Sequence, residues 1–160
     1  MLVDLPPWAI VVLNLISIPA IHLGVSLGFV KLPRSAFNPD SFVYRERAWE
    51  RGGKLYERGF LIRSWKPLLP DAAPWFKGFA KGNLASRDKE YIRTFIVETC
   101  RGEAAHYAQI PALLLTWIWN PWPAACLVLL VYAFLSNLPC ILLQRFTRIR
   151  LSGVLSGLPD

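Results

Sequence analysis

Nine consecutive residues, Glu98–His106, carry the side chains best suited to chemistry: two carboxylates, a guanidinium and an imidazole. Gly102 is the only helix breaker among them, and in a helix Glu98, Gly102 and His106 share one stripe because they are four residues apart. Glu103 precedes His106 by three residues, so its carboxylate could orient the imidazole. The spacing predicts a proton-transfer site with His106 as general base.

The charges of this segment also allow a purely structural interpretation. Glu98 and Arg101 are three residues apart and could form an ordinary ion pair, while charged side chains at a helix end could simply extend to water. Two arguments favour function. Ionisable groups at membrane depth are costly and usually functional. Gly102 costs a helix about 1 kcal/mol relative to alanine, so the notch it leaves is expected to be used.

The composition favours an integral membrane protein. Of the 160 residues, 54% are hydrophobic and the mean hydropathy is +0.34, which is too apolar for an ordinary soluble domain. Residues 1–160 are therefore expected to form a single membrane domain. Three dispersed cysteines, Cys100, Cys126 and Cys140, predict neither a zinc site nor a disulfide framework, and only Cys100 is a nucleophile candidate, a weak one.

Positive charge is concentrated in one part of the chain. Fourteen of the 18 Lys and Arg residues fall between Lys31 and Arg93, and none precedes Lys31. Cytoplasmic flanks of membrane spans are enriched in these residues, so the bias is a topology signal. Nucleic-acid binding explains it poorly in so apolar a chain, and no nucleic-acid partner is expected.

Apolar runs predict an all-α integral membrane protein with about three transmembrane helices plus cytoplasmic interfacial helices. The predicted segments are a first span over 8–30, a cytoplasmic interfacial region over 31–93, an active-site helix over 94–119 continuing into the second span, a third span over 124–143 and a cytoplasmic tail over 144–160. A cleaved signal peptide is disfavoured because the first run is too long for a signal core and no Lys or Arg precedes it.

Local signals set the helix ends. Asp88 is expected to begin the active-site helix, and Asn120-Pro121 to form a tight external turn between the second and third spans. His22 lies in the middle of the first span and is expected to hydrogen-bond a neighbouring helix.

A compact piece with two prolines, Arg63–Asp71, places Trp65 between the cations Arg63 and Lys66. A surface turn with a cation–π contact would explain this pattern. The functional alternative is a cap over the site, in which Arg63, Trp65 and Lys66 bind an anionic part of a substrate.

Polar residues recur at the end of the third span. Asn137 lies within about two turns of that end and could bond another helix or contact a substrate. Gln144, Arg145 and Arg148 follow at once and are further candidates for substrate binding. The positive-inside rule alone would explain two of the arginines in this stretch.

Taken in order, these motifs resemble one family. They are Arg63-x-Trp65-Lys66 with Asp71, Glu98-Thr99-x-Arg101-x-Glu103-x-x-His106, Asn137-x-Pro139 and Gln144-Arg145-Phe146-x-Arg148-x-Arg150-Leu151. Over roughly residues 37 to 155 the chain resembles the glycosyl-4,4'-diaponeurosporenoate acyltransferases of staphyloxanthin-type carotenoid synthesis. The block from Glu98 to His106, followed at the right separation by the Gln144 motif, is the specific part of the resemblance.

The resemblance implies an O-acyltransferase of the bacterial cell membrane. The apolar runs and the distribution of Lys and Arg predict that it is multi-pass, with its active site facing the cytoplasm. The resemblance also implies transfer of a fatty acyl chain to a sugar hydroxyl of a glycosylated carotenoid or another glycolipid. The partners would be that lipid-soluble acceptor, membrane lipid and an acyl thioester donor, either acyl-CoA or acyl carrier protein. No further cofactor and no metal are expected.

In the resulting mechanism, His106 oriented by Glu103 or Glu98 deprotonates the acceptor hydroxyl, which attacks the thioester. Arg101, Arg145 and Arg148 would hold donor phosphates or stabilise the oxyanion, with Asn137 as a neutral donor to the same oxygen. Two alternatives stay open. Glu98, Glu103 and His106 could bind the metal of a membrane hydrolase, or the chain could be a non-catalytic lipid-binding subunit.

Overall fold

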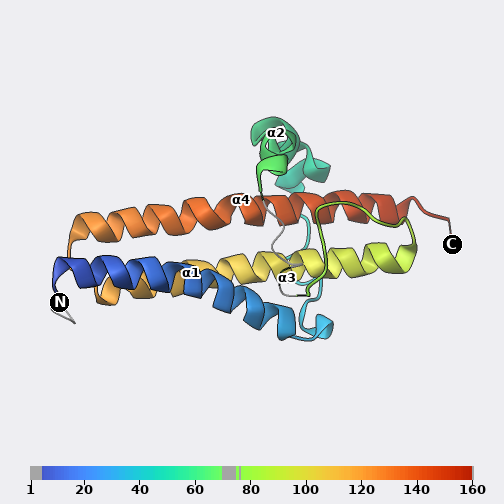
Figure 1. Cartoon of the computed structure of the whole chain (residues 1–160). Helices are drawn as coiled ribbons and strands as arrows, with labels where there is room; N and C mark the ends of the chain where they lie inside the picture. Colours follow the sequence, from blue (N-terminus) through green and yellow to red (C-terminus); the bar gives the residue numbers. More distant parts are fainter. Residues whose placement is uncertain (1–4, 70–74, 76, 160) are drawn as a thin grey trace.

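The structure is a computed structural model that describes residues 5–69, 75 and 77–159. The described residues form helices and connecting segments, which confirms the all-α prediction for this part of the chain (Figure 1). In order, the elements are α1 (Pro7–Lys31), the short helices η1 (Arg34–Ala36), η2 (Ala48–Gly53) and η3 (Leu55–Gly59), α2 (Ile62–Trp65), η4 (Lys66–Leu68), α3 (Lys89–Leu114), η6 (Leu115–Ile118) and α4 (Pro123–Ser156).

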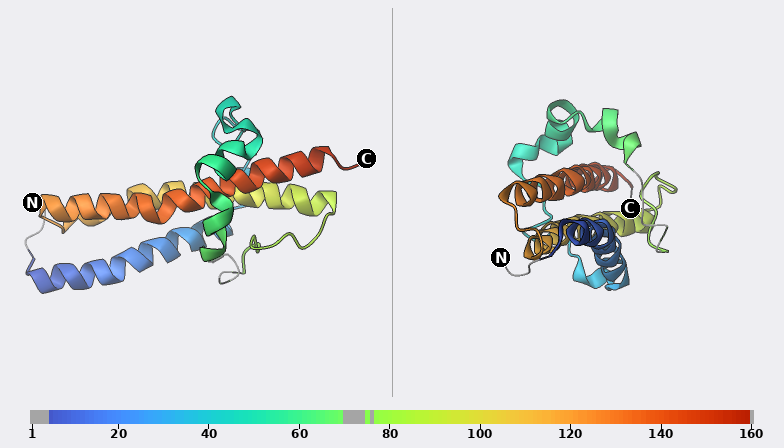
Figure 2. Two further views of the ribbon diagram at one scale, coloured as in Figure 1. Left: turned by 90° about the horizontal axis from the view of Figure 1, so that it is seen from above. Right: turned by 60° about the vertical axis from the view of Figure 1, so that its left-hand side comes forward.

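The three long helices run along one axis, and α3 packs against both α1 and α4 (Figures 1 and 2). Asp88 caps α3 as predicted, because its carboxylate accepts a hydrogen bond from the Tyr91 backbone N–H at 3.0 Å. The apolar face of its first turns, Ile92, Phe95 and Ile96, is buried against Leu151 of α4. The Asn120-Pro121 turn lies between η6 and α4, where it was expected.

Two of these helices, α1 and α4, are long and apolar enough to cross a membrane, which differs from the expected number of about three. The predicted second span lies in α3, whose first half carries Glu98, Arg101 and Glu103 in addition to three charges in its first two turns. These charges exclude most of α3 from an apolar stretch of spanning length. The predicted third span also extends further as a helix, because α4 continues through Arg145 and Arg148 to Ser156.

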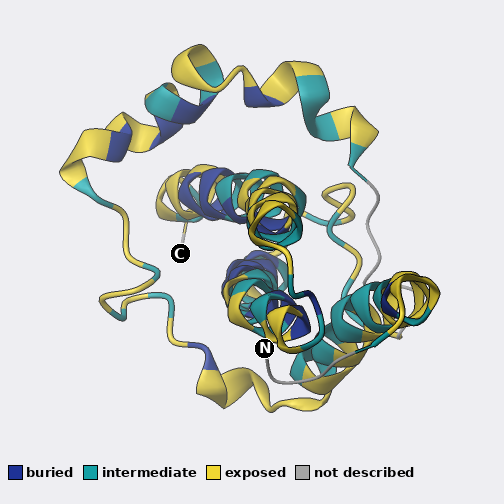
Figure 3. Cartoon of the chain, turned by 90° about the vertical axis from the view of Figure 1, so that its left-hand side faces the viewer, coloured by how far each residue is buried: buried dark blue, intermediate teal, exposed yellow. Residues whose placement is uncertain are grey.

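Residues 32–69, which we call the belt, wrap around the α3–α4 pair (Figure 3). Tyr56 and Ile62 anchor the belt through a buried cluster with Phe146 and Ile149 of α4. Because the belt begins at the end of α1 and returns across α4, it carries Lys66 back to the space between the long helices.

Candidate active site

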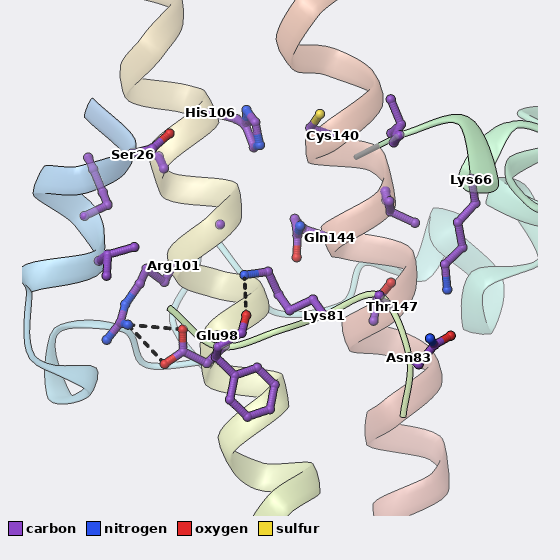
Figure 4. A pocket seen from close by; sticks show the side chains of 18 of the residues that line it. Ser26, Lys66, Lys81, Asn83, Glu98, Arg101, His106, Cys140, Gln144 and Thr147 are labelled. Carbon is purple, nitrogen blue, oxygen red and sulfur yellow. Dashed lines mark hydrogen bonds and ion pairs between the residues drawn. The ribbon is translucent and has the colours of Figure 1, made fainter. Parts of the chain in front are cut away.

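A cavity of about 690 Å³ lies between α1, α3 and α4 at the level where the charged residues begin (Figure 4). The belt contributes Lys66, Pro67 and Leu69 to its wall, and the segment before α3 contributes Phe79, Lys81, Gly82 and Asn83. Its charged and hydrogen-bonding lining side chains include Ser26, Lys66, Lys81, Arg101, His106 and Gln144. The cavity therefore combines a polar end with walls of apolar helices.

At Gly102, the side chain of Gln144 from α4 comes close to the backbone of α3. A Cβ atom added at Gly102 would lie 3.0 Å from Cδ of Gln144, so this glycine makes room for the Gln144 side chain. The side-chain amide of Gln144 thus lies against the notch that the sequence predicted at Gly102. Gly102, which Gln144 approaches, precedes His106 by four residues, or about 6 Å along the axis of α3.

His106 projects from α3 toward α4 and is held through Nδ1 (Figure 4). Nδ1 lies 3.0 Å from Oδ1 of Asn137 and 3.2 Å from Oε1 of Gln109. The amide nitrogen of Asn137 donates to the Ala133 carbonyl at 2.9 Å, which fixes its oxygen toward the imidazole. Nδ1 must then carry a proton, so the lone pair of the neutral ring is on Nε2. His106 is thus in the tautomer that a general base at Nε2 requires.

Neither carboxylate expected beside His106 is bonded to it. The Glu98 carboxylate, 2% exposed, is bound by Arg101 at 3.1 Å and by Arg34 of η1 at 3.1 Å. Arg101 also donates to the Leu32 carbonyl at 3.0 Å, which ties α3 to the end of α1. The predicted Glu98–Arg101 ion pair is therefore present at the wall of the cavity, with Arg34 as a second partner.

Glu103 belongs to a buried ionic network behind the cavity. Its two oxygens accept hydrogen bonds from Arg145 at 2.9 Å and from Arg148 at 2.5 Å. Arg145 also binds Glu50 of the belt at 2.9 Å and the Val43 carbonyl at 2.9 Å. The expected pairing of Glu103 with His106 is replaced by this network because two guanidinium groups from α4 reach the carboxylate.

The network also sets the ionisation of Glu50. Burial by itself would raise the pKa of this carboxyl group, but hydrogen bonds from Arg145, Tyr56 and the Arg47 backbone N–H outweigh burial and hold the pKa below its ordinary value. Glu50 is therefore a charged partner of Arg145. Arg145 and Arg148, which the sequence suggested as substrate ligands, are committed to internal partners and do not line the cavity.

Of the three residues predicted to cap the site, only Lys66 lines the cavity; Arg63 and Trp65 do not. Arg63 is 67% exposed and pairs with Glu57. Trp65 donates from its indole nitrogen to the Phe60 carbonyl at 2.8 Å and packs on the buried belt cluster. Asp71, part of the same motif, lies outside the described residues.

Two other chemistries find little support in the geometry. Burial is the main cause that raises the pKa of the Cys100 thiol to about 11, so this cysteine is a poor nucleophile at neutral pH. Within the described ranges, no group of three or more His, Cys, Asp or Glu side chains is arranged to hold a metal ion. Glu98 and Glu103, the proposed metal ligands, are each bound by arginines.

Sequence reasoning missed three residues that the structure brings to the site. Gln109 bonds His106, Lys81 lines the cavity, and Glu50 completes the ionic network. A signal existed for two of them. Gln109 follows His106 by three residues in a helix, and Glu50 is an acid inside a strongly basic segment.

The fold and the cavity define a class: the described residues form a helical protein with a polar cavity between long apolar helices. The sequence model of the glycosyl-4,4'-diaponeurosporenoate acyltransferase family matches residues 39–156. The chain therefore belongs to the glycosyl-4,4'-diaponeurosporenoate acyltransferase family and is an acyltransferase, which excludes the non-catalytic alternative.

Relatives of that name cover almost the whole chain. The glycosyl-4,4'-diaponeurosporenoate acyltransferase of Staphylococcus haemolyticus is 32% identical over 149 residues, or 90% of this chain and 85% of the relative. Proteins of the same name from two Staphylococcus aureus strains, bovine RF122 / ET3-1 and MRSA252, are each 27% identical over 150 residues, or 92% of this chain and 83% of the relative. No solved structure matches the chain.

Proposed function

We propose that this chain is a membrane O-acyltransferase that moves a fatty acyl chain from a thioester donor to a sugar hydroxyl of a glycosylated carotenoid or similar glycolipid. The observation that carries the proposal is His106, held by Nδ1 in the wall of a cavity and therefore able to accept a proton at Nε2. The names of the relatives supply the acceptor class, a glycosyl-4,4'-diaponeurosporenoate.

Burial supports membrane insertion of α1 and α4. In the most apolar 18-residue window of each helix, only 6% of α1 and 22% of α4 is buried, whereas the core helix of a soluble protein would be mostly buried. Leu15, Ile16 and Val128 are among the large apolar side chains left exposed. Lipid is the medium in which such faces are stable.

The position of the charges supports the orientation. No Asp, Glu, Lys or Arg occurs between residues 5 and 30 or between residues 104 and 144. The uncharged part of α4 spans about 33 Å at 1.5 Å per residue, close to the hydrocarbon thickness of a bilayer. The uncharged part of α3 would lie in the same layer. The positive-inside rule then places the belt and the polar end of the cavity at the cytoplasmic face of a bacterial membrane.

In the proposed reaction, Nε2 of His106 removes the proton of the sugar hydroxyl while its oxygen attacks the thioester carbonyl carbon. The carbon–sulfur bond breaks, and the imidazolium returns the proton to the departing thiolate, so no other reactant is needed. Gln144, beside Gly102 in the cavity wall, is placed to donate a hydrogen bond to the oxyanion. An acyl chain would lie between the apolar helices.

The polar end of the cavity suits a phosphate-bearing donor. Lys66, Lys81 and Arg101 line it, and among the described lining residues the one carboxylate is that of Glu98, which Arg34 and Arg101 bind. Acyl-CoA and acyl carrier protein both present a phosphate near the thioester arm, and excess positive charge attracts it. No other cofactor is proposed.

Acyl transfer by the purified protein in lipid vesicles tests the function. Palmitoyl-CoA and palmitoyl carrier protein would be offered separately with glucosyl-4,4'-diaponeurosporenoate, and the ester product measured by chromatography. We expect a product in which the acyl group is on the sugar, formed equally well in the presence of EDTA. Absence of product with both donors would contradict the thioester proposal, and loss of product in EDTA would support the metal-dependent alternative.

Filling the notch of the cavity should block the reaction. Gly102→Leu would place four carbon atoms between α3 and Gln144, and we expect transfer to fall more than tenfold because the added side chain would displace Gln144 and fill the cavity beside it. Gly153→Leu is the matched control, since a Cβ at this helical glycine of α4 meets nothing within 4 Å. Equal rates for both variants and the wild type would show that substrates bind elsewhere.

A further inference from the structure

Gln109 is one of the most completely buried polar residues of the described chain, with 2% exposure, and its side-chain hydrogen bonds go to the two histidines and to α1. Its amide nitrogen donates to the His22 carbonyl at 3.2 Å and to the Ser26 hydroxyl at 3.0 Å. Its amide oxygen lies 3.1 Å from Nδ1 of His22 and 3.2 Å from Nδ1 of His106.

The His22 carbonyl determines which way this amide points. A backbone carbonyl can only accept, so the Gln109 nitrogen must face it and the Gln109 oxygen must face the two imidazoles. That oxygen can only accept as well. Nδ1 of His22 and Nδ1 of His106 are therefore both protonated, and the two rings are held in the same tautomer by one atom.

The chain of hydrogen bonds continues to α4. With its proton on Nδ1, His22 accepts at Nε2 from the Tyr132 hydroxyl at 3.2 Å, and the two rings pack edge to face at 6.0 Å. His106 in turn donates to Asn137 of α4. All three long helices thus contribute to one hydrogen-bonded unit around His106: His22 from α1, Gln109 from α3, and Asn137 and Tyr132 from α4.

We infer that Gln109 is a positioning residue for acyl transfer, which fixes the tautomer and the ring orientation of His106 and transmits the position of α1 to it through His22. This inference rests on the proposed function, because it requires His106 to be the base. Two neutral amides, Gln109 and Asn137, thus take the place of the carboxylate expected beside the imidazole.

Two replacements of Gln109 separate positioning from packing. Gln109→Met has similar volume but no oxygen for His106, and we expect kcat to fall ten- to a hundredfold with KM within about twofold of the wild type. Gln109→Glu keeps an oxygen acceptor at the same place and should retain at least tenfold more kcat than the methionine variant. For stability we expect the reverse order, since a buried carboxylate costs more than a thioether.

A matched control loses a different polar bridge, between α1 and the turn that follows η6. Asn14→Leu removes the hydrogen bonds that Asn14 makes with Asn120 and Trp119, at the far end of the helices from His106. We expect its thermal unfolding temperature to fall while kcat stays within twofold of the wild type.

The outcomes distinguish the inference from the proposed function. If kcat of the two Gln109 variants follows their unfolding temperatures, or if Gln109→Met keeps wild-type kcat while a His106 variant is inactive, the inference is wrong and the function stands. If a His106 variant is fully active, the proposed base itself is wrong. Should Gln109→Met fail to fold, a Gln109→Glu variant that folds but loses more than a hundredfold in kcat overturns the inference.

Discussion

Replacing His106 with asparagine is expected to lower kcat for acyl transfer by about 100- to 10,000-fold, the usual contribution of a general base. Asparagine is the informative choice because its amide nitrogen lies near the position of Nδ1 and can still donate to Asn137 and Gln109. The substitution removes only the Nε2 end of the ring. The rate of product formation in vesicles would be measured at saturating donor and acceptor.

Folding must be shown to be intact for that result to count. Because His106→Asn preserves the buried hydrogen bonds, we expect its helicity and its thermal unfolding temperature to match the wild type closely. Wild-type turnover by the asparagine variant would exclude His106 as the base. Glu98 and Glu103 are poor replacements in that role, because arginine side chains already occupy the oxygens of both carboxylates.

The local features of the site were predictable from the sequence because they depend on helix geometry. The cap at Asp88, the single stripe of Glu98, Gly102 and His106, and the Glu98–Arg101 pair all follow from spacing within one helix. The apolar runs also predicted α1 and α4. The family resemblance, carried by motifs in three separate segments, was confirmed over residues 39–156.

The partners of these groups could not be predicted, because other helices supply them. Spacing allowed Glu103 to reach His106, but Glu103 is buried where α4 presents Arg145 and Arg148, and a buried carboxylate is most stable beside a guanidinium. His106 is then left to Asn137 and Gln109. The second of the three predicted spans is not confirmed, because only α1 and α4 are long and apolar enough to cross a membrane.

The largest effect on stability is expected from Arg145, which fastens the belt to the long helices. Its guanidinium binds Glu50, Glu103 and the backbone carbonyls of Val43 and Arg45 at 2.9–3.2 Å. Arg145→Met would leave two buried carboxylates short of a partner, and we expect the free energy of unfolding to fall by about 3–5 kcal/mol. Denaturant unfolding in detergent micelles would measure the loss.

Arg150→Met is the matched control on the same helix. Arg150 is 55% exposed and lies 3.6 Å from the Glu57 carboxylate, so its removal should cost less than about 1 kcal/mol. Arg145→Lys distinguishes the contribution of the positive charge to stability from that of the guanidinium hydrogen bonds. A lysine keeps the positive charge but cannot donate in four directions at once, and we expect it to recover only a minor part of the lost stability.

Two further measurements on Arg145→Met distinguish a loosened belt from a general loss of stability: KM for the acyl donor and trypsin cleavage of the belt. Because the belt carries Lys66 to the cavity, loosening it should raise KM for the acyl donor at temperatures where α1, α3 and α4 remain folded. Trypsin should also cleave Arg145→Met faster than Arg150→Met at the belt's exposed Lys54 and Arg58. If Arg145→Met were as stable and as protease-resistant as the control, the belt would be held by its Tyr56 and Ile62 cluster alone. Arg145 and Arg148 would then be available for the substrate-binding role that their position beside Gln144 suggested.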